Sequence, residues 1–213
     1  MQKNIGLPFI RRLSFWWHDS IKKLRAEKIL LLRKIFFILL LSILSLTSFA
    51  IPLNNVDKAG NVTLPNIELV DQYGKKHNLQ DYKGKVIMIN FWVSWCSDCK
   101  QEIPKVVELY KEYGENKKDV IILGVVNPTS KKYPNNKDRI EKKELLKYIA
   151  DNNYIFPSLF DETGKTYDEY EIEEYPSTFI LNENGHLRDY IKGAVSKEEL
   201  KESIDKVLNS VQK

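Results

Sequence analysis

The sequence predicts an α/β protein of three layers, with helices on both faces of a mixed β-sheet. Two apolar runs of strand length, residues 86–93 and 120–126, show the pattern of strands that are covered on both faces. Helix-length segments alternate with these runs, and strand–helix–strand units form parallel pairs through right-handed crossovers. A hairpin later in the chain adds antiparallel strands, which makes the predicted sheet mixed.

The first part of this domain contributes a hairpin, a strand and a helix. Residues 67–70 alternate in polarity, residues 71–74 form a turn and residues 76–79 return, which predicts a small β-hairpin before the main sheet. After the first apolar run a helix is expected over residues 96–113, and Gly114 fits its C-terminal end. Apolar residues recur on one face of that helix, at Ile103, Val106, Val107 and Tyr110.

The second part continues the alternation after the second apolar run. We expect a helix, a short strand, a short helix, a hairpin of two strands and a last helix. In chain order these segments are 141–152, 158–160, 165–172, 178–181, 187–191 and 197–211. Ser196 and Glu199 have the spacing of a capping box at the start of the last helix.

Composition and charge exclude several classes of protein. With 9 Gly and 8 Pro in 213 residues the chain is not collagen-like, and two cysteines permit neither a disulfide-dense scaffold nor a four-cysteine zinc site. Residues 1–34 hold nine Lys and Arg against two acids, so they carry more than the whole net charge of +4. The remaining chain is mildly acidic, which argues against a nucleic-acid partner.

The first fifty residues predict a targeting segment. A basic stretch, residues 1–34, precedes residues 35–51, which begin with the uncharged run IFFILLLSILSLTSFA. This order is typical of a signal peptide or a signal anchor with its positive side in the cytoplasm. Small residues at Ser48 and Ala50 and a run shorter than the roughly 20 residues of a membrane span favour cleavage, whereas the long basic stretch favours an anchoring hydrophobic helix.

The remaining chain is therefore expected outside the cytoplasm, where thiols tend to be oxidised. Residues 52–64 are polar with little periodicity and predict a linker, and residues 65–213 hold the predicted strands and helices. If the apolar segment is uncleaved, this domain is tethered to the outer face of the membrane. If it is cleaved, the domain is released, and the sequence leaves both outcomes open.

Cys96 and Cys99 form a dithiol pair directly after a buried strand, at the predicted start of a helix. Unpaired N–H groups and the helix dipole favour an anion there, so we expect the pKa of the Cys96 thiol to be lowered. Cys99 lies one turn further along and is expected to be more buried. Cys96 is thus the predicted nucleophile and Cys99 the resolving thiol.

A structural disulfide and half of a metal site are the alternatives for this pair. A disulfide that closes so short a loop removes little conformational entropy from the unfolded chain and so stabilises the fold little. A metal site would need further soft ligands, and haem attachment needs a His where this chain has Lys100. Redox use without metal or cofactor is the interpretation that the context favours.

The segment around the cysteines, residues 90–104 (NFWVSWCSDCKQEIP), closely resembles the active-site segment of thioredoxin-fold proteins of the TlpA/ResA-like group. The resemblance covers about residues 62–211 and includes Gly74, Gly84, Lys85, residues 175–179, Gly185 and Gly193 in the family's order. It implies a thioredoxin-like fold with an added N-terminal hairpin and an extracytoplasmic thiol–disulfide oxidoreductase. Many members are anchored by an N-terminal helix and re-reduced by a membrane electron donor of the CcdA/DsbD type.

The resemblance also implies roles for residues near the cysteines. Pro176 matches the cis-proline that faces the redox pair, and Tyr175 before it would contact substrate through its backbone. The family often has a smaller or β-branched residue at the position of Tyr175. Trp95, which precedes the first cysteine, is the third predicted substrate-binding residue. For Pro176 an ordinary turn proline is the alternative.

Glu102 matches an acidic residue that ResA-like members carry three positions after the second cysteine. On a helix it lies one turn beyond Cys99, where its carboxylate could accept the proton of Cys99 as that thiol attacks the mixed disulfide. Cytoplasmic thioredoxins carry a buried Asp where this chain has Asn90, and the loss of that proton relay adds weight to Glu102. A solvated helix acid is the alternative.

Asp98 lies between the cysteines, where its charge opposes ionisation of Cys96. We therefore expect a reducing couple, with a potential nearer to about −270 mV than to about −120 mV. Asp98 could instead be a first-turn acid that accepts backbone N–H groups, and both roles can hold together.

The resulting hypothesis is a dithiol reductase of protein disulfides. An oxidase or isomerase is the rival enzyme, and a binding module or chaperone without turnover is the rival from another class. A peroxidase is disfavoured because the Pro and Thr expected before such a nucleophile are absent at Cys96.

Two charged stretches lie elsewhere in the domain. Residues 161–174 hold seven acids against Lys165 and lead into Pro176, so they are expected to border the active face, where they could select a basic partner segment. Residues 131–143 are basic and rich in Asn and predict an exposed loop. For both stretches a plain solvated surface is the simpler interpretation.

Overall fold

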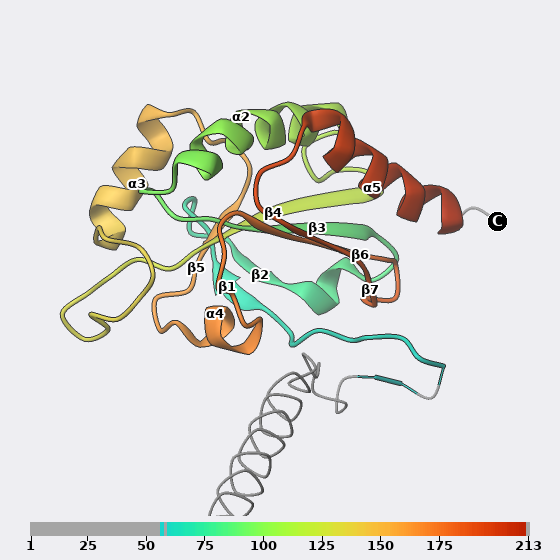
Figure 1. Ribbon diagram of the computed structural model, residues 1–213, viewed down its shortest axis with the longest axis horizontal. Coiled ribbons are helices and arrows are strands. Elements are labelled where there is room, and N and C mark those ends of the chain that lie inside the picture. Colours follow the sequence, from blue (N-terminus) through green and yellow to red (C-terminus); the bar gives the residue numbers. More distant parts are fainter. Residues whose placement is uncertain (1–55, 58, 212–213) are drawn as a thin grey trace, which may run out of the picture. The chain divides into compact units, whose positions relative to one another are not determined.

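The main sheet has five strands in a computed structural model that describes residues 56–57 and 59–211 (Figure 1). The strands are β3 (Val86–Phe91), β4 (Val120–Val126), β5 (Ser158–Phe160), β6 (Ser177–Leu181) and β7 (Leu187–Lys192). Their spatial order is β5-β4-β3-β6-β7. The pairs β3–β4 and β4–β5 are parallel, whereas β6 runs antiparallel to both β3 and β7, so the predicted mixed sheet is confirmed.

Helices cover both faces of this sheet, as predicted. In Figure 1, α2, α3 and α5 cover one face and the short α4 covers the other. Their bounds are α2 (Ser97–Glu112), α3 (Lys142–Asp151), α4 (Lys165–Glu169) and α5 (Lys197–Val211). Side chains of β3 alternate between the two layers: Met88 joins the core packed under α2 and α5, and Ile89 and Phe91 join the core on the other face with Tyr167 of α4.

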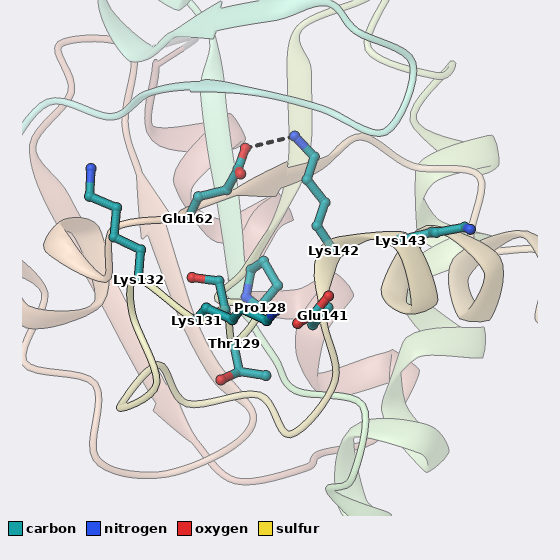
Figure 2. A pocket seen from close by; sticks show the side chains of 9 residues that line it. Pro128, Thr129, Lys131, Lys132, Glu141, Lys142, Lys143 and Glu162 are labelled. Atoms are coloured by element: carbon teal, nitrogen blue, oxygen red, sulfur yellow. Dashed lines mark hydrogen bonds and ion pairs between the residues drawn. The ribbon is translucent and has the colours of Figure 1, made fainter.

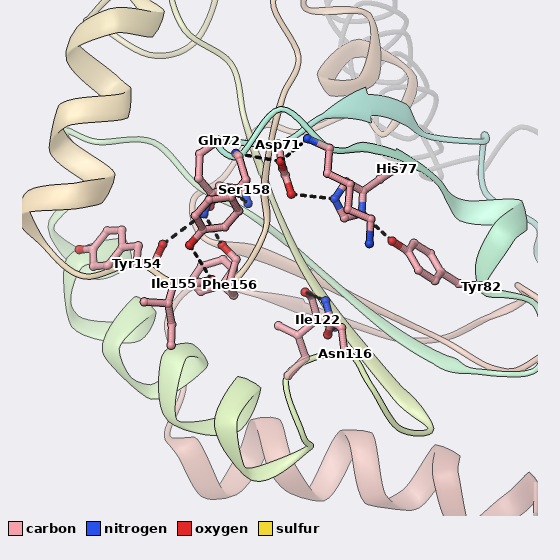
Figure 3. A network of polar contacts seen from close by, with 12 residues as sticks. Asp71, Gln72, His77, Tyr82, Asn116, Ile122, Tyr154, Ile155, Phe156 and Ser158 are labelled. Carbon is pink, nitrogen blue, oxygen red and sulfur yellow. Dashed lines mark hydrogen bonds and ion pairs between the residues drawn. The ribbon is translucent and has the colours of Figure 1, made fainter.

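A two-stranded hairpin, β1 (Glu68–Val70) with β2 (Lys76–Asn78), precedes the main sheet, which confirms the predicted addition. Side chains of its turn fasten it to β5 and to the residues just before that strand, and the contacts of Gln72 are seen in Figure 3. Gln72 donates through Nε2 to the Phe156 carbonyl at 2.9 Å, and its Oε1 accepts the N–H of Ser158 at 2.7 Å. One antiparallel β-bridge, between Asp71 and Leu159, also joins the hairpin to β5. The hairpin thus supports the edge of the main sheet through side-chain contacts and this single bridge, without forming a full additional ladder.

Several element ends differ from the prediction. The first apolar run leaves the sheet at Phe91, although the next two residues remain buried. The helix predicted over residues 165–172 is shorter, because Glu171 has a φ of 51°, which a right-handed helix does not accept. A 3₁₀ helix, η2 (Leu79–Tyr82), follows the hairpin and was not predicted. None of these differences moves the cysteine pair.

The basic stretch and the apolar run of residues 1–51 lie outside the described residues, so the structure leaves the prediction of a signal peptide or anchor untested. Among the residues that are described, no helix combines the length and the apolar character that crossing a bilayer requires.

Candidate active site

Cys96 and Cys99 lie where β3 passes into α2. Cys96 is the N-cap of the helix, and the backbone N–H of Cys99 donates to its Sγ at 3.1 Å. The two residues are joined by a disulfide, with Cα atoms 5.3 Å apart. Cys96 is 8% exposed and Cys99 is fully buried, so the predicted difference in burial is confirmed. The helix end therefore presents one accessible sulfur with an N–H donor directed at it.

The strand that pairs with β3 brings the predicted substrate-binding residues to this sulfur. β6 begins at the same edge of the sheet at which β3 ends, because the two strands are antiparallel. The Tyr175–Pro176 peptide bond before β6 is cis, and the Tyr175 carbonyl oxygen lies 3.5 Å from Cys96 Sγ. Burial raises the pKa of the Tyr175 phenol to about 12, so its ring is a neutral surface beside the disulfide at ordinary pH.

Trp95 stands beside the cysteine as a partly exposed aromatic platform. Its side chain is 39% exposed, and its ring lies edge-on to that of Tyr175, with centroids 5.8 Å apart. Its Nε1 donates to the carbonyl of Lys137 at 3.0 Å, and the Arg139 guanidinium lies 4.4 Å from its ring centroid. The structure therefore brings all of the predicted substrate-binding residues together and adds Arg139, which the sequence analysis did not single out.

The prediction of an exposed loop over residues 131–143 is confirmed for most of these residues, although residues 142 and 143 already lie in α3. Asp138 is the exception, and it was also missed. Its side chain is buried. Asp138 accepts the backbone N–H of Ser94 at 2.8 Å and the Ser94 hydroxyl at 2.6 Å, and it also accepts the N–H of Arg139 at 2.7 Å. The loop is thus tied to the segment that leads into Cys96, over a sequence separation that no local pattern reveals.

Glu102 faces the interior, so the alternative of a solvated helix acid is wrong. It lies one turn beyond Cys99 on the buried face of α2. Its carboxylate accepts Asn90 Nδ2 at 2.9 Å and the backbone N–H of Val195 at 3.1 Å, and Asn90 also donates to Thr178 at 2.8 Å. Burial raises the pKa of Glu102, although both hydrogen bonds favour the charged form.

Asp98 lies in the first turn of α2 and is exposed. Its carboxylate accepts the Ser97 hydroxyl at 3.3 Å. Within the described part of the chain no backbone N–H donates to it, so the alternative role of satisfying N–H groups gains no support. The residues described contain no cluster of three or more His, Cys, Asp or Glu that could hold a metal ion.

A cysteine pair at a helix N-terminus, facing a cis-proline at the edge of this mixed sheet, defines a thioredoxin-fold dithiol site. The comparisons with known proteins agree. The sequence profile of the AhpC/TSA family matches residues 60–190, more than half of the chain, and the chain belongs to that family. It is a thiol–disulfide oxidoreductase of the ResA/DsbE type.

Individual relatives give the same assignment. The chain is 27% identical over 185 residues to the thiol-disulfide oxidoreductase ResA of Geobacillus thermodenitrificans, which covers 86% of this chain and 99% of the relative. It is 34% identical over 141 residues to the thioredoxin-like protein YneN of Bacillus subtilis, covering 66% and 76%. The crystal structure of the exposed lipoprotein thioredoxin Etrx1 of Streptococcus pneumoniae superposes with a TM-score of 0.58 at 29% identity, covering 67% of this chain and 99% of that one.

Proposed function

We propose that this protein is an extracytoplasmic reductant of protein disulfides. The Cys96 thiolate attacks a client disulfide, forms a mixed disulfide and releases one client thiolate, which takes up a proton. The Cys99 thiol then loses its proton and attacks Cys96 Sγ, so the second client thiolate leaves and the Cys96–Cys99 disulfide forms. Two electrons pass from the protein dithiol to the client, and the protein must afterwards be re-reduced.

The observation that carries this proposal is the position of Cys96 Sγ. It accepts the Cys99 N–H at a helix N-terminus, and it lies 3.5 Å from the Tyr175 carbonyl oxygen. The first contact stabilises a thiolate. The second places backbone polar groups beside the sulfur. An extended client segment could form hydrogen bonds with these groups while its disulfide approaches Cys96 Sγ. Trp95 and Pro176 line the same approach and complete the proposed substrate site.

Glu102 is proposed as the group that holds the proton of Cys99 during resolution. Both residues are buried on one face of α2, one turn apart. A carboxylate with a raised pKa can accept a proton near neutral pH and return it, whereas an ordinary exposed carboxylate is too weak a base. Asn90 and Val195 hold the two carboxylate oxygens in place.

The cellular setting is part of the same proposal. We assign residues 1–34 and 35–51 to a basic segment and a signal peptide or anchor, residues 52–64 to a linker and residues 65–213 to the thioredoxin-like domain. Electrons would come from a membrane donor of the CcdA/DsbD type, and the membrane would be reached through the N-terminal helix if it is uncleaved. One structural relative is an exposed lipoprotein, which supports an extracytoplasmic setting.

Insulin-disulfide reduction with a small dithiol as electron source tests the proposal. We expect turnover by the wild type, no turnover by Cys96→Ser, and accumulation of a mixed disulfide by Cys99→Ala, which also captures clients when it is expressed in cells. A binding module or chaperone without turnover would show the same background rate for the wild type and for Cys96→Ser, and that result would refute the proposal.

The redox potential of the cysteine pair tests the oxidase alternative, and a substitution of Asp98 tests the predicted effect of its charge on that potential. Replacing Asp98 with Asn removes a charge that opposes the thiolate, so the reduced form gains stability and the potential rises by roughly 15–30 mV, given that tenfold in the equilibrium constant is about 30 mV. Equilibration with glutathione buffers measures the potential. Asp119→Asn is the control, because Asp119 is exposed and lies before β4, at the opposite edge of the sheet. A wild-type potential near −120 mV would contradict the reductant role.

A further inference from the structure

The topology of the sheet places Cys96 between two segments of opposite charge. β3 lies between β4 and β6, so the residues that follow β3 lie between the loop that follows β4 and the segment that precedes β6. The segment before β6 contains the exposed Glu173 and Glu174. The loop after β4, residues 127–141 and here called the β4–α3 loop, carries cations that continue into the start of α3.

These cations have no acidic partners within the described residues, with one exception. Lys142 pairs with Glu162 at 2.7 Å. The unpaired cations are Lys131, Lys132, Lys137, Arg139 and Lys143. A pocket of about 370 Å³ lies between the β4–α3 loop and α3. Figure 2 shows Lys131, Lys132 and Lys143 beside it, together with the paired Lys142.

Arg139 is the cation of this loop that contacts a residue of the active site. Its guanidinium packs 4.4 Å from the ring centroid of Trp95, the residue before the nucleophile, and its backbone is fixed by Asp138. Stacking on an aromatic face leaves the edge N–H groups of a guanidinium free, and a guanidinium is less strongly hydrated than an ammonium group. It is therefore suited to bind a carboxylate on a segment that lies across Trp95.

We propose that Arg139 is a specificity-determining residue that selects client segments with acidic residues next to the cysteine under attack. The inference deepens the proposed function and rests on it. A client whose acidic side faces Arg139 gains attraction there and avoids repulsion from Glu173 and Glu174. The opposite charge arrangement meets like charges on both sides of Cys96.

The occupant is a protein segment rather than an anionic membrane surface. The pocket beside the loop also contains Glu141 and Glu162, which oppose a uniformly anionic surface. Arg139 lies against the residue that precedes the nucleophile, so whatever it binds must be near the reacting disulfide at the same time.

Three cystine peptides of one sequence, with two Asp, two Ser or two Lys beside the reactive cysteine, test the inference. We expect the wild type to show kcat/KM for the Asp peptide about fivefold above that for the Lys peptide at low salt, the upper range for an exposed ion pair. The ratio should fall toward one as salt is added. Arg139→Glu should invert the ratio, and Arg139→Lys, which keeps the charge but loses the stacked guanidinium, should keep only part of it.

Arg188→Glu is the matched control. Arg188 is an exposed cation at the start of β7, and this end of the strand lies away from the cysteine pair. Its Asp-to-Lys ratio should equal that of the wild type. Equal ratios for Arg139→Glu and Arg188→Glu would overturn the inference. The inference would also be overturned if the wild type showed no charge preference among the peptides and instead sedimented with anionic vesicles in a manner that Arg139→Glu abolishes. Failure of the wild type to reduce the Ser peptide would refute the proposed function, which is a separate outcome.

Discussion

Replacing Glu102 with Gln is expected to slow the release of client from the mixed disulfide by about 10²- to 10⁴-fold, the usual contribution of a positioned proton acceptor. The amide keeps the shape of the side chain and its hydrogen bond from Asn90 or Val195, but it cannot accept the proton of Cys99. In a single-turnover reduction of a cystine peptide, quenching at successive times and separating the mixed disulfide gives the rate of its breakdown. This rate is obtained separately from that of the initial attack by Cys96.

The pH dependence gives a second measurement on the same residue. Because burial raises the pKa of Glu102 in the folded protein, the fold favours its protonated form. This contribution to stability is fully present below the ordinary carboxyl pKa, and it is lost as pH rises through the folded-state pKa. Urea unfolding of the oxidised protein should therefore show wild-type stability falling over that interval relative to Glu102→Gln, with the resolving rate rising over the same interval.

Glu108→Gln is the matched control for both measurements. Glu108 lies on the exposed side of the same helix, where it pairs with Lys197 at 2.8 Å, so its loss should alter stability only slightly and leave the resolving rate unchanged. If Glu102→Gln resolves the mixed disulfide at the wild-type rate across the pH range, Glu102 is only a buried structural acid and the proton acceptor must be sought elsewhere.

The layered fold and the cysteine pair were predictable because their signals are local. Continuous apolar runs mark β3 and β4, and the spacing of Cys96 and Cys99 marks a helix start after a buried strand. The family resemblance supplied Pro176 and Glu102, whose geometry near the disulfide and on the buried face of α2 is now visible. Pro176 and Glu102 were therefore predicted from motifs that can be recognised in short stretches of the sequence.

The residues that escaped prediction act across long separations. Asp138 reads as one acid in a lysine-rich loop, and its partner Ser94 is remote in the sequence. Arg139 reads as one cation among several, and only the fold shows that it lies on Trp95. Asn90 was interpreted as the loss of an acidic group, whereas in the fold its amide supports Glu102. Composition identifies such side chains as polar, but only the packing of separate loops shows which are buried and paired.

Asp138→Ala is expected to lower the free energy of unfolding by about 3 kcal/mol, because it removes a buried carboxylate that accepts several hydrogen bonds and leaves buried donors without partners. The Ser94 N–H and hydroxyl lose their acceptor at the entrance to the active-site turn. We also expect kcat/KM for a neutral cystine peptide to fall by about 10- to 100-fold, as for a small displacement of a reacting group. Urea unfolding and steady-state kinetics, at a temperature where the variant is fully folded, measure the two effects.

Asp161→Ala separates lost stability from lost positioning. Asp161 is equally buried and accepts the N–H groups of Gly164 and Tyr167 at 3.0 Å each, but it holds the turn into α4 rather than the turn before Cys96. Its loss should destabilise the fold by a similar amount with kcat/KM retained, and Asp138→Asn, which keeps one acceptor oxygen, should recover part of the activity. If Asp138→Ala and Asp161→Ala have the same kcat/KM when fully folded, the tie between Asp138 and Ser94 is structural support alone and does not position the nucleophile.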